Sequence, residues 1–338
     1  MNTILVQNIS DLIRRSHHIL LITDERIDGD TLGSTMGLFH VLTNAGKRVS
    51  VFSPKPLPET FRYLPMINII QRNDAVLKQP TIDLAIVCDS SDGVFLPSAL
   101  SKMFHKVPLI SFDHHLTNPN YGTINVVEPT AASTADVVWR FVKAAGYTIT
   151  PNAAQCLLTG IITDTQVFFS ANTTNAAVKA AAELLKYGAK LPDIIRANYV
   201  NKTPNFLRIW GIALERLFPD DAFGGIATVV TQKDILDIGA SAEECESIAG
   251  VISEFLNAVL DDTHDIIVVY RETNDGHVKG SARARTKNVA AVAERLYGGG
   301  GHKLAAGFKI MNARMQELPN HRWHVVRSTV DRIKKPAA

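Results

Sequence analysis

Three short apolar runs in the first third of the chain each lead into an aspartate, and this pattern limits the folds available to it. The runs and the aspartates that follow them are 19–22 with Asp24, 84–87 with Asp89, and 107–112 with Asp113. Continuous apolar runs of this length are typical of strands buried on both faces of a parallel sheet. Another strand is expected at 49–53, and helical patterns separate the strands, which indicates right-handed crossovers.

The fold class predicted for the first part is therefore α/β, with an open and mainly parallel sheet flanked by helices. In such sheets ligands bind outside the carboxyl ends of the strands, where these aspartates are placed. Helices are expected at 2–15, from about Leu32 to Gly46, at 131–145, and at 153–163, where the last leads into Asp164.

The last third of the chain predicts a smaller α/β domain with a mixed sheet. Strands are expected at 224–231 and 265–272, and the second turns at Asn274-Asp275-Gly276 into a partner at 277–286. Ser241 and Glu244 have the spacing of a capping box for a helix that reaches about residue 260. A further helix starts near Asn288, and a closing helix is expected from about residue 320.

Composition excludes several classes of protein. The 338 residues carry a net charge of +2, so no general attraction to long nucleic acid or to an anionic membrane is expected. No apolar run approaches the roughly 20 residues that span a bilayer. The three cysteines are far apart and form no CxxC pair, which favours a reducing compartment, and we expect a cytoplasmic protein.

Five carboxylates and one imidazole follow these predicted strands and helices. They are Asp24, Asp28, Asp30, Asp89, His114 and Asp164. Carboxylates that converge on one crevice repel one another, and two divalent cations would neutralise them. One carboxylate between the cations could bridge both, as in two-metal phosphoryl-transfer sites that activate a water or hydroxide. This ligand set favours Mn²⁺ or Mg²⁺, with Co²⁺ or iron as further candidates.

A run of four glycines, 298–301, precedes His302 and follows the helix expected from Asn288. Glycine amides can bind an anion closely, although a flexible helix end explains the run equally well. Arg283, one strand earlier, and His302 favour the first interpretation, because both side chains can contact a phosphate.

With these residues assembled, the chain resembles the DHH phosphoesterase family, in its two-domain branch of nanoRNases and pAp phosphatases. The resemblance covers nearly the whole chain. The segments that resemble the four motifs and the DHH-associated C-terminal domain are IDGDTLGS, DLAIVCDSSD, FDHH, GIITDT, GSARART and YGGGGHKLAAGF. It implies a catalytic metal-binding domain at 1–188, a helical connector at 189–220 and a substrate-binding domain at 221–338.

The resemblance also implies roles for single residues. One cation would be held by Asp28 and Asp89, and the second by Asp30, Asp89, His114 and Asp164. His115 would face the phosphate as an acid or electrostatic stabiliser, and Asp113 would orient a histidine. Arg283, Gly299, Gly300, Gly301 and His302 would bind the substrate's terminal phosphate or nucleotide.

Asp24 departs from the family pattern, which usually has histidine at this position. Ile27 also replaces a common proline, and Gln166 stands where glycine is frequent. If Asp24 is a ligand, the first cation site contains only carboxylates and prefers hard ions such as Mg²⁺ or Mn²⁺. A weak or empty first site is the alternative.

The function expected is two-metal hydrolysis of short oligonucleotides or of a nucleoside bisphosphate such as pAp, with catalysis centred on Asp89 and His115. One alternative is a phosphodiesterase for cyclic or linear dinucleotides such as c-di-AMP or pApA. Another is a nucleotide-binding regulator of low activity, suggested by Asp24. A pyrophosphatase or polyphosphatase fits the glycine-rich segment less well. A homodimer is an open expectation that no residue pattern supports.

Overall fold

The computed structural model describes residues 2–91, 95–170, 172–200, 202–261 and 263–327, and of residues 242, 243, 245–247, 254 and 302 it describes the backbone alone. The chain divides into two compact units, residues 1–201 and 202–338. The division lies inside the range 189–220 that we assigned to a connector.

The first unit contains the predicted open parallel sheet. Its strands are β1 (His18–Ile22), β2 (Arg48–Phe52), β3 (Leu84–Cys88), β4 (Leu109–Asp113) and β5 (Ile124–Val127). Their order is β2-β1-β3-β4-β5, and every neighbouring pair is parallel. All five residues of β1, of β3 and of β4 are buried, as their apolar runs predicted. The fold class is confirmed, and β5 is an additional strand.

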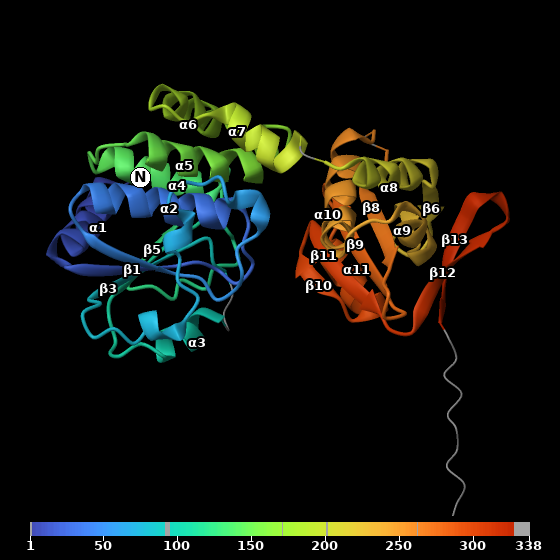
Figure 1. Cartoon of the computed structure of the whole chain (residues 1–338), viewed down its shortest axis with the longest axis horizontal. Helices are drawn as coiled ribbons and strands as arrows, with labels where there is room; N and C mark the ends of the chain where they lie inside the picture. Colours follow the sequence, from blue (N-terminus) through green and yellow to red (C-terminus); the bar gives the residue numbers. More distant parts are fainter. Residues whose placement is uncertain (1, 92–94, 171, 201, 262, 328–338) are drawn as a thin grey trace, which may run out of the picture. The chain divides into compact units, whose positions relative to one another are not determined.

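Helices cover both faces of this sheet. The helices of this unit are α1 (Thr3–Arg15), α2 (Gly29–Asn44), α3 (Phe95–Ser101), α4 (Thr134–Ala144), α5 (Pro151–Asp164), α6 (Asn175–Lys186) and α7 (Leu191–Ile195), of which α6 and α7 pack outside α5. α2, α4 and α5 lie on one face, and α3 lies on the other (Figure 1). The predicted start of α2 near Leu32 was wrong by three residues. Asp28 caps this helix by accepting from the amides of Asp30 and Thr31, so Asp30 lies within the first turn.

Two glycines bring α2 and α5 together backbone to backbone. A Cβ atom at Gly33 would lie 2.5 Å from the amide nitrogen of Gly160, and a Cβ atom at Gly160 would lie 2.7 Å from Oδ1 of Asp30. Larger residues would push the helices apart. The close approach therefore places the first turn of α2 beside the last turn of α5.

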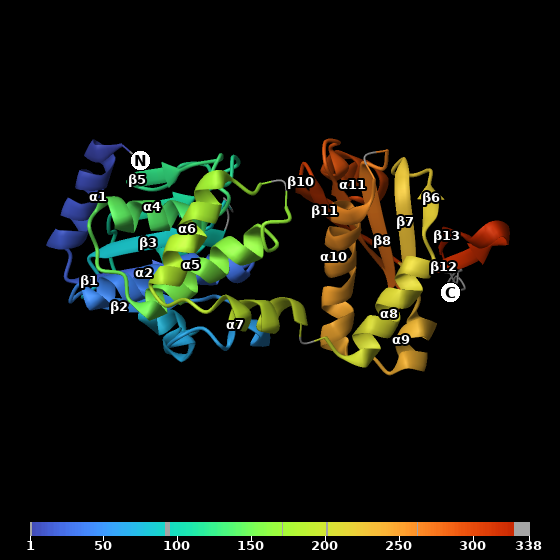
Figure 2. The ribbon, with the colours of Figure 1, turned by 90° about the horizontal axis from the view of Figure 1, so that it is seen from above.

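The second unit is built on a six-stranded mixed sheet, again as predicted. Its strands are β6 (Phe218–Asp220), β7 (Gly225–Val230), β8 (Ile266–Glu272), β9 (Val278–Ala284), β10 (Gly300–His302) and β11 (Ala305–Ile310). Their order is β10-β11-β9-β8-β7-β6, with only β7 and β8 parallel. Its helices are α8 (Pro204–Glu215), α9 (Gln232–Ile238), α10 (Ala242–Val259) and α11 (Val289–Tyr297), of which α8, α9 and α10 are seen from above in Figure 2.

Local sequence signals in this unit behave as expected, with one exception. The capping box of Ser241 and Glu244 starts α10, and β8 and β9 form the predicted hairpin. The closing helix expected from about residue 320 was wrong. Residues up to 327 form instead the strand β13 (Arg322–Arg327), paired antiparallel with β12 (Ala313–Leu318), and the later tail lies outside the described residues. None of the helices described is both long enough and apolar enough to cross a membrane.

Candidate functional site

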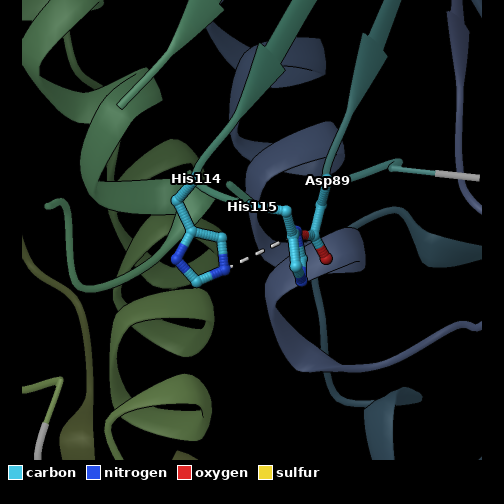
Figure 3. Close-up of side chains that lie close together, drawn as sticks. All are labelled: Asp89, His114 and His115. Atoms are coloured by element: carbon cyan, nitrogen blue, oxygen red, sulfur yellow. Dashed lines mark ion pairs between the residues drawn. The ribbon is translucent and has the colours of Figure 1, made fainter. Parts of the chain in front are cut away.

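Asp89, His114 and His115 meet at the carboxyl ends of β3 and β4. Oδ1 of Asp89 lies 4.0 Å from Nε2 of His114 and 3.5 Å from Nδ1 of His115. Figure 3 shows these three side chains together, contributed by two neighbouring segments. One ligand atom from each lies within 4.8 Å of the others, a spacing at which the three could hold a single metal ion.

A second group of the same kind shares His114. It consists of Asp30 from α2, His114, and Asp164 from the end of α5, again with ligand atoms within 4.8 Å of one another. Nε2 of His114 lies 3.7 Å from Oδ2 of Asp164. The structure thus assembles five of the predicted residues, Asp30, Asp89, His114, His115 and Asp164.

The ring of His114 is oriented so that one nitrogen is free to bind a cation. Its Nδ1 lies 3.4 Å from the carbonyl oxygen of Ala131, which can only accept a hydrogen bond, so the proton belongs on Nδ1. Nε2 therefore presents its lone pair to Asp89 and Asp164. Asn172 fixes Asp164 in turn, because its amide donates to the carboxylate over 3.1 Å.

Two threonines position the carboxylate of Asp89. The hydroxyl of Thr31 donates to Oδ2 over 2.7 Å, and the hydroxyl of Thr134 donates to Oδ1 over 3.0 Å. The backbone of Asp89 has a φ of 61°, a left-handed conformation that turns the chain sharply out of β3. Sequence inspection missed both threonines, since a hydroxyl residue at a helix start is common for capping alone.

Asp113 orients a histidine, as we expected. Its Oδ1 accepts from the backbone amides of His114 and His115 and, over 2.8 Å, from Nδ1 of His115. Burial lowers the affinity of His115 for a proton, but this bond and the charges of Asp89 and Asp113 outweigh it and raise the His115 pKa to about 9. Asn118, also missed from the sequence, donates to the other oxygen of Asp113.

The carboxylates at this edge disfavour one another's charge. Burial of its carboxyl group, followed by the charges of Asp89 and Asp164, raises the pKa of Asp30 well above its ordinary value. The same causes raise the pKa of Asp28 to about 7, although Asp28 as a residue keeps an exposed surface. Asp30 is partly compensated, because the amides of Thr134 and Ala135 at the start of α4 donate to its two oxygens.

Asp24 and Asp28 belong to neither group of ligand atoms among the described residues. Asp24 is buried in the loop after β1, where its Oδ1 accepts from the amide of Arg26 over 2.9 Å. Its Oδ2 is buried and has no hydrogen-bond partner. A buried carboxylate oxygen without a partner is unfavourable unless a cation or a water satisfies it.

These residues fit divalent cations. The donors are hard carboxylate oxygens and an imidazole nitrogen with a free lone pair, and five of the residues lie at ligand spacing. Burial, followed by the charges of neighbouring carboxylates, raises the pKa of Asp28 and of Asp30. Added positive charge would relieve the repulsion and satisfy Oδ2 of Asp24. No group of this kind was found elsewhere in the described part of the chain.

The glycine run of the second unit serves several structural purposes. Gly298 ends α11 with a φ of 63°. A Cβ atom at Gly299 would lie 2.5 Å from the carbonyl oxygen of Gly307, and one at Gly301 would lie 2.3 Å from that of Ala305. Gly300 differs, because a Cβ atom there would meet nothing within 4 Å. No neighbouring atom in the described structure explains this glycine.

Gly300 is exposed at the edge of the sheet, on the face that carries Arg283 and that α10 covers over β8 and β9. It pairs with Gly307 across β10 and β11, Gly307 pairs with Ser281, and Arg283 lies two residues further along β9. Arg283 alternates with Ala282 and Ala284, which face the core, so its side chain points to the opposite face. His302 ends β10, and its side chain lies outside the described part of the structure.

Comparison with known proteins adds two family matches and a set of full-length relatives. Residues 18–161 match the DHH family, N-terminal domain, and residues 230–326 match the DHHA1 domain. The bifunctional oligoribonuclease and PAP phosphatase NrnA of Thermus thermophilus is 32% identical over 316 residues, covering 93% of this chain and 90% of that protein. The protein of the same name from Bacillus subtilis is 26% identical, covering 92% and 93%.

Solved structures show the same fold. An exopolyphosphatase-related protein from Bacteroides fragilis superposes with a TM-score of 0.79 at 22% identity, and the match covers 91% of each chain. This likeness confirms the fold and carries no information about the substrate.

Proposed function

The chain belongs to the DHH family of phosphoesterases and is a hydrolase, and from that premise we propose that it acts on short oligonucleotides and on nucleoside 3′,5′-bisphosphates such as pAp. Two relatives that match over nine tenths of this chain are named as oligoribonucleases and PAP phosphatases. The observation that carries the proposal is the pair of ligand groups that share His114 at the carboxyl ends of the sheet.

We assign two cation positions to this edge. Asp30, Asp89, His114 and Asp164 would hold one, and Asp24, Asp28 and Asp89 would hold the other. Mn²⁺ is the first choice, with Mg²⁺ or Co²⁺ as alternatives. Cations bound there supply positive charge that activates water and stabilises the negative charge developing on phosphorus.

The protein's own groups complete the chemistry. Thr31 and Thr134 fix the carboxylate of Asp89 by donating to its two oxygens, so that it would be positioned to bind a cation. His115 keeps its Nδ1 proton on Asp113, and with a pKa of about 9 before cations bind it is charged at neutral pH. Asp113 fixes the orientation of the ring, and a protonated His115 would donate a hydrogen bond to the phosphate or to the leaving oxygen.

In the second unit we assign the terminal phosphate or nucleotide to Arg283, Gly299, Gly300, Gly301 and His302. Gly300 supports this assignment, because no neighbouring atom requires a glycine there. Its backbone without a side chain allows a ligand to approach closely. The chain has a balanced charge, so long nucleic acid is excluded from the proposal. We place the activity in the cytoplasm, in keeping with cysteines such as Cys88 and Cys156 that are buried and free.

A hydrolysis panel tests the substrate. The purified protein is given pAp, pApA, short RNAs and cyclic dinucleotides, each with Mn²⁺ and with Mg²⁺. Release of AMP from pAp and of mononucleotides from short RNAs is the expected result. Activity confined to cyclic or linear dinucleotides would favour the alternative phosphodiesterase, and nucleotide binding without turnover would favour a regulator.

Metal analysis tests the assignment of Asp24. The metal content of the purified protein and its affinity for Mn²⁺, Mg²⁺ and Zn²⁺ are measured beside an Asp24→His variant. We expect the native protein to prefer the harder ions and the variant to shift towards Zn²⁺, because imidazole is the softer ligand. Equal content and equal preference in both proteins would contradict a role for Asp24 as a ligand.

A further inference from the structure

The segment that follows Asp164 has a conformation that its residues disfavour. Gln166, Val167 and Phe168 have φ values of 49°, 59° and 67°, so three consecutive residues other than glycine are left-handed. Such residues are uncommon one at a time, and a β-branched residue such as Val167 is a clear outlier. A turn of this kind persists only where surrounding contacts hold it.

Hydrogen bonds and one anchor hold this turn against α5. The amide of Val167 donates to the carbonyl of Ile162 over 2.8 Å, and the amide of Ser170 donates to the carbonyl of Thr165 over 2.9 Å. Phe168 packs partly buried against the core of the first unit. The turn thereby reverses the chain just after a proposed metal ligand.

Phe169 is the residue that this turn leaves in solvent. It is 58% exposed, although it directly follows the anchored Phe168. Asn172 closes the loop by donating to the carboxylate and to the carbonyl oxygen of Asp164. Phe169 is three residues before Asn172, and three residues span at most about 10 Å. Its backbone therefore stays near Asp164 and the metal-binding edge.

We propose that Phe169 is a nucleobase-stacking residue that positions the nucleotide whose phosphate is hydrolysed. The proposal rests on the proposed function, because it needs a substrate that carries a base beside the reacting phosphate. An exposed aromatic ring directly after a strained turn, on a loop that Asn172 ties back to Asp164, offers a flat apolar surface near the metal-binding edge. Stacking of this kind tolerates different bases, since every base has an aromatic face.

The experiment compares pAp with a base-free analogue in which tetrahydrofuran replaces the nucleoside, keeping both phosphates. The variants are Phe169→Ala, Phe169→Tyr, which keeps a ring, and Phe104→Ala. Phe104 is a matched control, because it is 67% exposed and precedes β4, at the opposite end of that strand from His114. Thermal melts of all variants check the fold.

We expect Phe169→Ala to lower kcat/KM for pAp by roughly 5- to 150-fold, the range that one stacked base accounts for. Its kcat/KM for the base-free analogue should stay within about two-fold of the native value, and Phe169→Tyr and Phe104→Ala should behave as the native protein. Equal losses on both substrates, or no loss on either, would overturn the stacking role while leaving the phosphoesterase in place. Failure of the native protein to hydrolyse pAp would overturn the proposed function as well.

Discussion

The two candidate sites of this chain differ in the groups that form them, which are charged side chains in the first unit and exposed backbone in the second. In the first unit, charged side chains such as Asp30, Asp89 and His114 crowd at the carboxyl ends of parallel strands and helices. In the second unit, the candidate surface is backbone that Gly300 and Gly307 leave bare, beside the cationic Arg283. The first arrangement is electrostatically unfavourable until cations neutralise it, whereas the second needs no ion to be stable.

The difference teaches where each site is vulnerable. A carboxylate cluster fails when one charge is removed, because the ligand count and geometry change. A glycine surface fails when an atom is added, because the ligand loses its close approach. Substitutions that remove charge and substitutions that add volume should therefore have separable effects in the two units.

The largest effect is expected for Asp89→Asn, which removes a charge shared by both proposed cation positions. The loss should be on the order of 10³ in kcat, since charge stabilisation by metal ions amounts to several kcal/mol. Steady-state hydrolysis of pAp with Mn²⁺ measures it. Asp74→Asn, at a partly exposed aspartate paired with Lys102, is the control and should keep full activity. Full activity of Asp89→Asn would refute the metal assignment.

Cation binding should stabilise the first unit in a pH-dependent manner. The pKa of Asp28 is raised to about 7 from its ordinary 3.8, so the cation-free native state binds its proton more tightly than the unfolded chain. The stabilisation that the protonated Asp28 gives the native state is present at low pH and is lost as the pH rises towards 7. Deprotonated ligands bind cations best, so Mn²⁺ should add more stability at pH 8 than at pH 6.

At a hundred times its Kd, the cation adds about 2.7 kcal/mol to the free energy of unfolding. Thermal melts with Mn²⁺ and with EDTA at the two pH values measure the difference. An equal shift at both values would contradict proton release on binding. Hydrogen exchange under the same conditions should show no effect of the cation on residues 202–338, because both ligand groups lie in the first unit.

Two neighbouring glycines separate binding from stability in the second unit. Gly300→Ala adds a methyl group where no atom lies within 4 Å, so the melting temperature should not change. Its KM for pAp should rise roughly 10- to 100-fold if the ligand approaches this backbone. Gly299→Ala is the matched variant, and its clash with Gly307 and Phe308 should lower stability by about 1–3 kcal/mol. An unchanged KM in Gly300→Ala would remove this glycine from the binding surface.

The smallest effect is expected for Val167→Gly, beside the ligand Asp164. Relief of the left-handed strain stabilises the fold, but glycine also gives the unfolded chain more conformational entropy to lose on folding, so the net gain should be about 0.5–1 kcal/mol. Val178→Gly, at an exposed position inside α6, is the matched control and should lower stability instead. Urea denaturation measures the free energy of unfolding of both variants. A loss of stability in Val167→Gly would show that the turn is unstrained.

The sequence by itself determined which residues stand at the functional edge. Apolar runs predict buried parallel strands, and parallel strands align their carboxyl ends, so Asp89, Asp113 and His114 had to share one edge. The hairpin of β8 and β9 and the capping box of α10 followed in the same way from local turn and cap chemistry. These signals are short-range, and short-range patterns can be read without coordinates.

Only the tertiary structure decided which atoms meet. Asp30 and Asp164 join one ligand group because Gly33 and Gly160 let α2 and α5 touch, and this packing joins residues far apart in the chain. The support of Asp89 by Thr31 and Thr134, the free Oδ2 of Asp24 and the exposure of Phe169 are also products of packing. The end of the chain was mispredicted for a related reason. Residues 322–327 form a strand because β12 offers them a partner, and pairing between strands overrides local propensity.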